Sequence, residues 1–189
     1  MDAVRSVAGN PTVRLFVGSL LASADRQPFV EYQAALRHAG WQGAFVRPET
    51  LHLTYAFLGD TPVSAISEVI QRIEAVLPRQ SLPVLWDVTG TFGPRARPRV
   101  LWAGSRRPAL GLIEWARRIG DVLGPWIATS PGAWTPHVTL LRIKHVPDSS
   151  MRPVWHPFTT RVTAIQLIES RLTPDGPVYR VLTDFSLND

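Results

Sequence analysis

Residues 47–60, RPETLHLTYAFLGD, carry the strongest structural signal in the chain. Apolar and aromatic side chains crowd Leu51 to Leu58, which predicts a β-strand, and Gly59-Asp60 is typical of the turn that ends one. Because side chains two residues apart in a strand share a face, His52 and Thr54 point to one side, while their apolar neighbours point to the other, toward a core. The segment therefore presents an imidazole and a hydroxyl together at the opening of a strand.

A second segment, Pro136 to Leu140 (PHVTL), repeats this order of His, apolar, Thr, apolar. It lies near the start of a strand predicted over Trp134 to Ile143, and the same alternation places His137 and Thr139 on one face. A single His-x-Thr is weak evidence, because an ordinary strand with a hydrogen-bonded surface histidine explains it as well. Two copies, each at the opening of a strand, favour a shared site.

The rest of the chain alternates strands with amphipathic helices. Further strands are predicted over Thr12–Leu20, Leu82–Thr91, Val100–Ala103, Thr160–Ser170 and Val178–Phe185, with a hairpin turn at residues 173–176 between the last two. Helices are predicted over Asp25–Ala39, from a cap at Thr61-Pro62 to Leu77, and over Pro108–Leu123. This order predicts an α+β fold in which helices lie outside a mixed or antiparallel sheet.

Length and composition agree with a single domain over residues 1–189, in which residues 1–11 form a flexible N-terminal extension. The 189 residues are 45% hydrophobic and 19% charged, which excludes a disordered or fibrous chain. Cysteine is absent, so disulfides, thiolate zinc sites and a cysteine nucleophile are excluded. No apolar run is long enough to cross a membrane, no secretory leader opens the chain and no association signal stands out, so we expect a cytoplasmic monomer.

Arginine supplies almost all of the positive charge, because Lys144 is the only lysine among 20 basic residues. Seven arginines lie between Arg95 and Arg118, where Glu114 is the single acid. Guanidinium groups bind phosphate well and stay charged at any working pH. The stretch therefore predicts either an anionic partner such as RNA or a solvated basic face, and a GC-rich coding bias explains the composition equally well.

Two imidazoles at one site suit general acid–base catalysis. With an ordinary pKa near about 6.5, they can hold opposite protonation states at neutral pH, one as acid and one as base. That division fits in-line displacement at phosphorus, in which the attacking and the leaving oxygen each need a proton moved. Thr54 and Thr139 are expected to bind the phosphate oxygens, and Arg142 is expected to offset the developing charge.

Other chemistries lack their motifs. HExxH is absent and each His-x-Thr offers one ligand, so no metal site is expected. A Gly-x-Ser-x-Gly elbow is absent, and so are the Gly-rich loops that bind nucleoside triphosphates or nicotinamide cofactors, so no cofactor is expected.

The two segments make the chain resemble the two-histidine (2H) phosphoesterases, and within them the LigT-like RNA 2′,3′-cyclic phosphodiesterases. The likeness rests on residues 13–17 (VRLFV), 47–60 and 134–142 (WTPHVTLLR), with weaker echoes at 99–102 (RVLW), Glu169-Ser170 and Tyr179. It implies a two-lobed, pseudo-symmetric LigT-like fold, each lobe a mostly antiparallel sheet with outer helices, and an active-site cleft between the lobes. Residues 18–22 (GSLLA) depart from the polar residue and Leu-Pro that the family commonly has there.

The resemblance also implies metal-independent hydrolysis of a 2′,3′-cyclic phosphate, on RNA or on a small cyclic nucleotide, to a 2′-phosphate. By that analogy His52 is the proton donor to the departing 3′ oxygen and His137 is the proton acceptor from water, although the reverse assignment stays open. Thr54, Thr139 and Arg142 would hold the phosphate.

Side chains beside the two motifs are candidates for contacts with the rest of the RNA. Phe16 and Trp134 are candidate base-stacking platforms, and Arg99 is a candidate RNA contact. Phe57 lies an odd number of residues after Thr54, so strict alternation predicts that it faces the core.

Besides a phosphodiesterase acting on a different cyclic phosphate, for instance on a nucleotide-sugar derivative, two alternative functions stay open at this point. The same fold would support a 2′-5′ RNA ligase acting on tRNA halves, in which a 5′-hydroxyl replaces water. A non-catalytic RNA-binding module that uses the Arg-rich stretch is the other, although binding alone does not call for two titrating groups.

Overall fold

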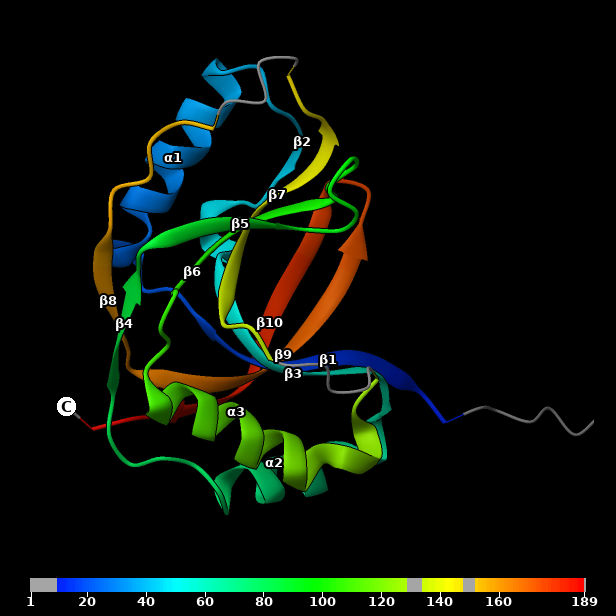
Figure 1. Ribbon diagram of the computed structural model, residues 1–189. Coiled ribbons are helices and arrows are strands. Elements are labelled where there is room, and N and C mark those ends of the chain that lie inside the picture. The colour runs from blue at the N-terminus through cyan, green and yellow to red at the C-terminus, as the bar shows by residue number, and fades with distance from the viewer. Residues whose placement is uncertain (1–9, 129–133, 148–151, 189) are drawn as a thin grey trace, which may run out of the picture.

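The computed structural model describes residues 10–128, 134–147 and 152–188, and it has the α+β architecture expected from the sequence. Antiparallel strands form its centre, with α1 (Gln27–His38) at one end and α2 (Ile66–Glu74) and α3 (Leu110–Leu123) together at the opposite end (Figure 1). Short 3-10 turns occur at Ser23–Asp25, Pro48–Thr50, Val63–Ala65 and Gly124–Trp126. Of the predicted N-terminal extension, only Asn10 and Pro11 lie within the described residues.

Within the described residues, eight strands form one large antiparallel sheet with two halves. The first half runs in the order β10-β9-β1-β3, and the second runs in the order β7-β6-β5 with β2 also paired to β7. The strands of the first half are β1 (Thr12–Leu20), β3 (His52–Pro62), β9 (Ala164–Thr173) and β10 (Gly176–Ser186). Those of the second half are β2 (Gln42–Phe45), β5 (Val88–Phe92), β6 (Val100–Gly104) and β7 (His137–His145).

The two halves meet at a single residue pair of the β3–β7 ladder, Leu53 with Val138. Each of these residues directly follows its motif histidine, and both side chains are buried. The motif strands therefore touch at this pair and separate on either side of it. The sheet opens into two lobes where the two His-x-Thr segments lie, which positions both segments at the cleft.

Two strands expected to be continuous are each broken into two strands at a corner. The predicted strand Leu82–Thr91 is β4 (Leu82–Trp86) followed by β5, and the predicted strand Thr160–Ser170 is β8 (Phe158–Val162) followed by β9. β4 and β8 pair with each other in a separate two-stranded sheet. At the first corner the Asp87 backbone N–H donates to Gly104 O, and the Asp87 carboxylate accepts from the Arg106 N–H.

The end of β3 and the start of the second helix were also predicted wrongly. Gly59 has a φ of +67° but does not end the strand. β3 continues to Pro62 because β1 pairs along it as far as Thr12 with Pro62, and the Val63 N–H then donates to Pro11 O. Thr61-Pro62 is therefore strand and not a helix cap, and α2 begins later, at Ile66. β2 was missed because its four residues, QGAF, have no strand periodicity.

The helices bury the apolar faces that their sequence spacing predicts. α1 buries Phe29, Tyr32 and Leu36, α2 buries Val69 and Ile73, and α3 buries an apolar stripe that includes Leu112, Trp115, Ile119 and Leu123. These side chains and the inward faces of both sheet halves belong to one hydrophobic cluster. The two lobes are therefore packed around a common core. In the described part of the chain, no helix is long and apolar enough to span a membrane.

Candidate active site

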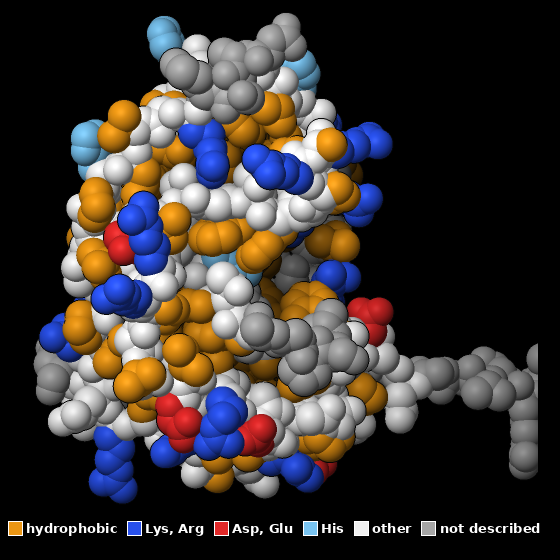
Figure 2. Space-filling model, in the orientation of Figure 1, with side chains coloured by type: hydrophobic (Ala, Val, Ile, Leu, Met, Phe, Trp, Pro, Cys, Tyr) orange, Lys and Arg blue, Asp and Glu red, His pale blue; other side chains and the backbone are white. Residues whose placement is uncertain are grey.

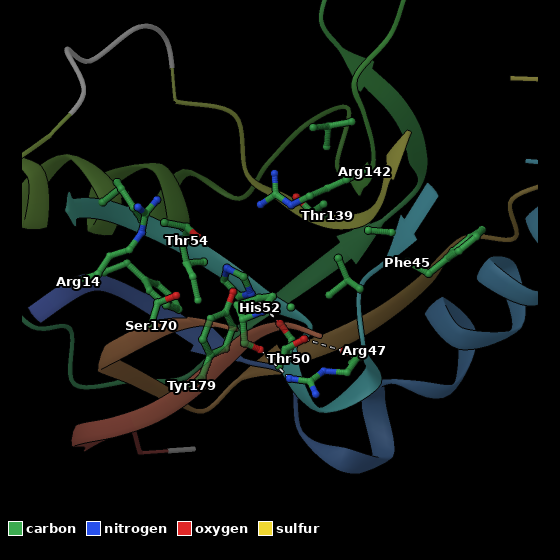
Figure 3. Close-up of a pocket in the computed structure, with 18 of the residues that line it drawn as sticks. Arg14, Phe45, Arg47, Thr50, His52, Thr54, Thr139, Arg142, Ser170 and Tyr179 are labelled. Carbon is green, nitrogen blue, oxygen red and sulfur yellow. Dashed lines mark hydrogen bonds between the residues drawn. The ribbon is translucent and has the colours of Figure 1, made fainter. Parts of the chain in front are cut away.

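The two His-x-Thr segments open β3 and β7 and line a common cleft of about 630 Å³ between the lobes (Figure 3). His52, Thr54, His137 and Thr139 are each half-buried and line this cleft. The residue between each His and Thr is buried on the opposite face of its strand. The structure thus brings the four motif side chains together as the strand alternation predicts.

Both imidazoles are held in the same way by the backbone that precedes them. Nδ1 of His52 lies 2.7 Å from Thr50 O, and Nδ1 of His137 lies 2.8 Å from Thr135 O. A carbonyl oxygen only accepts, so Nδ1 of each ring carries the hydrogen and donates it. This leaves Nε2 of each ring as the atom that can take up or release a proton.

Aromatic rings surround each imidazole on the side of its own lobe. The Phe16 and Tyr179 ring centroids lie 4.9 Å and 5.3 Å from that of His52. The Phe92 and Trp102 centroids lie 4.8 Å and 6.2 Å from that of His137. These rings restrict the orientation of both imidazoles and reduce their contact with water.

The enclosure favours the neutral form of both histidines. Burial lowers the pKa of His52 below its ordinary value of about 6.5; the hydrogen bond to Thr50 opposes this, and the charges of His137 and Arg142 add to the lowering. Burial also lowers the pKa of His137, against the hydrogen bond to Thr135. Both rings are therefore poised to be neutral in the empty cleft at neutral pH, and an anion bound between them would favour protonation.

β3 and β7 share an irregularity that simple alternation does not predict. Each ladder register shifts just after the motif, so Tyr55 has no partner on β1 and Leu140 has no partner on β6. Such a bulge re-aims the side chains that follow it. The fifth residue after each histidine, Phe57 in β3 and Arg142 in β7, therefore lines the cleft. The prediction that Phe57 faces the core is wrong for this reason.

Among the residues that the structure describes, three guanidinium groups line the cleft, those of Arg14, Arg47 and Arg142 (Figure 3). Burial raises the pKa of the Tyr179 hydroxyl, and the positive charges of these three arginines oppose that shift, Arg142 most strongly. Phosphate groups are favoured ligands of guanidinium. The arrangement can thus hold an anionic group between two imidazoles.

The structure divides the three candidates for RNA contact. Phe16 lines the cleft, but only 3% of its surface is exposed and its ring packs against His52 and Tyr179, so it supports the site and offers little free face to a base. Trp134 does not line it, because its indole N–H donates to Thr54 O and its ring stacks on Tyr55, on the core side of β3. The Arg99 side chain is exposed on the β5–β6 connection and does not line the cleft either, while its backbone bonds to Phe92 and Ile143.

The Arg-rich stretch between Arg95 and Arg118 does not form one basic patch. Arg117 and Arg118 lie on α3 and pair with Glu114, and Arg117 also pairs with Asp121. α3 runs along the lower part of the molecule (Figure 1), and Figure 2 shows acidic and basic side chains intermixed along that lower edge. The number of arginines in this stretch of sequence is therefore larger than the number that can contribute to one basic surface next to the cleft.

Sequence reasoning missed several residues that line the cleft, among them Arg14, Arg47, Ser170 and Tyr179. Arg14 had a readable signal, because it lies two residues before Phe16 on a predicted strand and so shares its face. Ser170 and Tyr179 were noted only as weaker echoes of the family, with no role at the site, because the positions of β9 beside β1 and of β10 beside β9 follow from the sheet order alone. In the described part of the chain, no three His, Asp or Glu side chains gather as a metal site would require.

Comparisons with known proteins agree with this geometry. Residues 21–102 match the family model for LigT like Phosphoesterase. An RNA 2′,3′-cyclic phosphodiesterase of Thermus thermophilus is 34% identical over 183 residues, which cover 93% of this chain and 90% of that protein. One of Aquifex aeolicus is 30% identical over 155 residues, which cover 77% and 82%.

Solved structures show the same fold. The structure of TT0787 of Thermus thermophilus is 30% identical with a TM-score of 0.74, and the match covers 92% of this chain and 97% of that one. Escherichia coli LigT in its apo form is 24% identical with a TM-score of 0.79 over 95% and 99%, which supports the fold. The LigT-like fold expected from the sequence is confirmed, and the chain belongs to the LigT-like family of two-histidine phosphoesterases.

Proposed function

We propose that this protein hydrolyses the 2′,3′-cyclic phosphate at the end of an RNA to a 2′-phosphate. The observation that carries the proposal is the matched pair of imidazoles, each held through Nδ1 by the carbonyl two residues before it, with both rings lining one cleft. The relatives from Thermus thermophilus and Aquifex aeolicus are named as RNA 2′,3′-cyclic phosphodiesterases, which supports the same chemistry here.

The reaction moves one proton at each side of the phosphorus. His137 Nε2 takes a proton from water as the water oxygen bonds to phosphorus, and the bond from phosphorus to the 3′ oxygen breaks. His52 Nε2 gives its proton to that oxygen, which leaves a 3′-hydroxyl and a 2′-phosphate. The proton that His137 gains equals the one that His52 loses, and solvent exchange resets the pair.

The remaining groups of the cleft stabilise the phosphate. Thr54 and Thr139 share the faces of the two histidines, so their hydroxyls can donate to the non-bridging oxygens. Arg142 turns toward the same space through the bulge in β7 and offsets the negative charge that develops there. The anion also offsets the lowered pKa of His52, so substrate binding favours the protonated state that the acid needs.

The experiment is product analysis with single variants. RNA ending in a 2′,3′-cyclic phosphate should yield a 2′-phosphate in the presence of EDTA. His52→Ala and His137→Ala should each lower kcat by about 10² to 10⁴, while RNA binding and the unfolding midpoint stay close to wild type. His156→Ala, an exposed histidine outside the cleft, is the matched control. Unchanged turnover in either cleft variant would contradict the proposal, and a joined strand as product would instead favour the ligase.

A substrate with sulfur in place of the 3′ oxygen tests which histidine is the acid. Thiolate leaves without protonation, so activity of His52→Ala should recover on this substrate and activity of His137→Ala should not. Recovery of the His137 variant alone would reverse the two roles.

The remaining sequence predictions concern scope and state. We propose that small 2′,3′-cyclic nucleotides are substrates as well, because one cyclic phosphate is all that the two motifs need to engage. A monomer and a cytoplasmic location stay predictions from the sequence.

A further inference from the structure

The three arginines of the cleft differ in whether another group of the protein already holds them. Arg47 donates from Nη2 to Pro177 O at 2.6 Å, and its Nε lies 3.4 Å from a Glu49 carboxylate oxygen. Arg142 is assigned above to the reacting phosphate. Arg14 forms no ion pair within the described residues, and its guanidinium carbon lies 4.7 Å from the centre of the Phe57 ring. Arg14 is therefore held in place by Phe57, and its positive charge is paired neither with an acid of the protein nor, by the assignment above, with the reacting phosphate.

The position of Arg14 is set by the strand that carries it. Arg14 and Phe16 share one face of β1, and the Phe16 ring lies 4.9 Å from that of His52. Two residues along a strand span about 6.7 Å, which is of the same order as the distance between successive phosphates of a nucleic-acid strand. The charge of Arg142 contributes to lowering the pKa of His52, whereas that of Arg14 does not. The strand spacing therefore places Arg14 about one phosphate-to-phosphate distance along β1 from the residue that packs on His52.

A hydroxyl that lines the cleft, that of the mostly buried Ser170, lies beside Arg14. β1 pairs with β9 through Leu15 and Glu169, so the next step of this antiparallel ladder brings Ser170 beside Arg14. Ser170 lines the cleft, and Figure 3 shows Arg14, Ser170 and Thr54 at the same end of it. Within the described residues, the Ser170 side chain has no hydrogen-bond partner. A guanidinium and a hydroxyl facing one space form a suitable anion site.

Acidic side chains near the cleft could compete with an anion for Arg14; Asp175 lines the cleft, and within the described residues it forms no ion pair with Arg14. Asp60 is the partner of Arg14 in the β1–β3 register, and its side chain is exposed. The Arg14 guanidinium nevertheless lies over Phe57 rather than in an ion pair with Asp60. The bulge that turns Phe57 into the cleft thereby supplies the surface on which Arg14 rests.

We propose that Arg14, stacked on Phe57 and assisted by Ser170, binds the phosphodiester that precedes the terminal nucleotide. The site would make an oligonucleotide with a cyclic phosphate end a better substrate than a mononucleotide. This inference rests on the proposed function, because the reacting phosphate must lie between the two histidines. The ligand class is an internal, singly charged phosphodiester of RNA.

The test compares two dinucleotides that end in a 2′,3′-cyclic phosphate and differ only in the internal linkage, a phosphodiester or a neutral methylphosphonate. A charge-assisted hydrogen bond predicts that the wild type prefers the phosphodiester by about tenfold or more in kcat/KM. Arg14→Gln should reduce that preference to about one, and Arg14→Lys, which keeps the charge, should retain part of it. Arg118→Gln, which removes an exposed arginine on α3, should keep the full preference.

The possible results distinguish failure of the second phosphate site from failure of the proposed function. A wild-type preference of one, or a full preference in Arg14→Gln, would overturn the second phosphate site while leaving the proposed function intact. Equal losses on both dinucleotides in Arg14→Gln would also overturn it, because Arg14 would then serve the reacting phosphate. If the wild type hydrolysed neither dinucleotide and no mononucleotide 2′,3′-cyclic phosphate, the proposed function would fall, and this inference with it.

Discussion

Replacing Gly90 with alanine tests whether the ring of Trp102 sets the position of His137. Gly90 on β5 pairs with Trp102 on β6, and the indole lies over the glycine backbone. A Cβ on Gly90 would lie 2.2 Å from Trp102 Cζ2, whereas ordinary contact begins at 3.4 Å. The ring must therefore shift by about 1.2 Å or the strands must separate.

The shift would be transmitted to the motif histidine. Trp102 pairs with Thr139 and shares its cleft-facing side, where the ring centroids of Phe92 and His137 lie 5.3 Å and 6.2 Å away. Overpacking of this kind costs about 1–3 kcal/mol of stability, and a misplacement of about 1 Å at a reacting group can cost about 10²-fold in rate. We expect Gly90→Ala to lose both stability and kcat by about these amounts.

The assay combines denaturant unfolding with the rate of hydrolysis of a 2′,3′-cyclic nucleotide. Gly120→Ala is the matched control, because the nearest atom to its added Cβ is Ile127 Cδ1 at 4.0 Å. Within α3, that alanine should add about 0.5–1 kcal/mol of stability and leave the rate unchanged. Wild-type stability and rate in Gly90→Ala would refute the reasoning that Trp102 positions His137.

Two further predictions concern titrating groups. Because burial lowers the pKa of both cleft histidines, the bell-shaped pH profile of kcat/KM should peak below about pH 6.5. Arg142→Gln should raise the pKa of His52 and move that peak upward, so an unmoved or more acidic peak would argue against their coupling. A hydrogen bond from Arg171 and, to a smaller extent, one from Arg180 hold the pKa of the buried Glu169 carboxyl below its ordinary value. Its stabilising contribution should be present at neutral pH and lost as pH falls through that lowered pKa. Glu169→Gln should therefore lower the melting temperature at pH 7, and a deficit of the same size at an acidic pH that protonates the wild-type carboxyl would contradict this assignment.

The faces of the two motif strands were predictable because they depend on local geometry. In a strand, residues two apart share a face whatever lies beside the strand, so His52 and Thr54 could be grouped without any tertiary information. The same reasoning grouped His137 with Thr139. It failed for Phe57, because the bulge that turns this residue into the cleft exists only through the pairing of β3 with β1.

Strand ends and helix starts were less predictable for a related reason. Residues 82–91 are strand-forming almost throughout, yet the chain turns at Asp87 because β4 pairs with β8 and β5 pairs with β6. Gly59 has the signal of a strand end, yet β3 runs on because β1 continues beside it. In both cases the partner strand, which is remote in sequence, decided the outcome.

By itself the sequence determined the α+β class, the apolar faces of the helices, and the two strands that each present an imidazole and a hydroxyl. These features follow from periodicity, which is a property of neighbouring residues. Only the tertiary structure decided that the two motif strands meet at Leu53 and Val138, and that Arg14, Ser170 and Tyr179 line the cleft beside them. The tertiary structure also placed Trp134, a candidate for RNA contact, on the core side of β3. The physical reason is that strand order and bulges arise from pairing between segments that are distant in the sequence. Local sequence patterns do not show which of these segments pair.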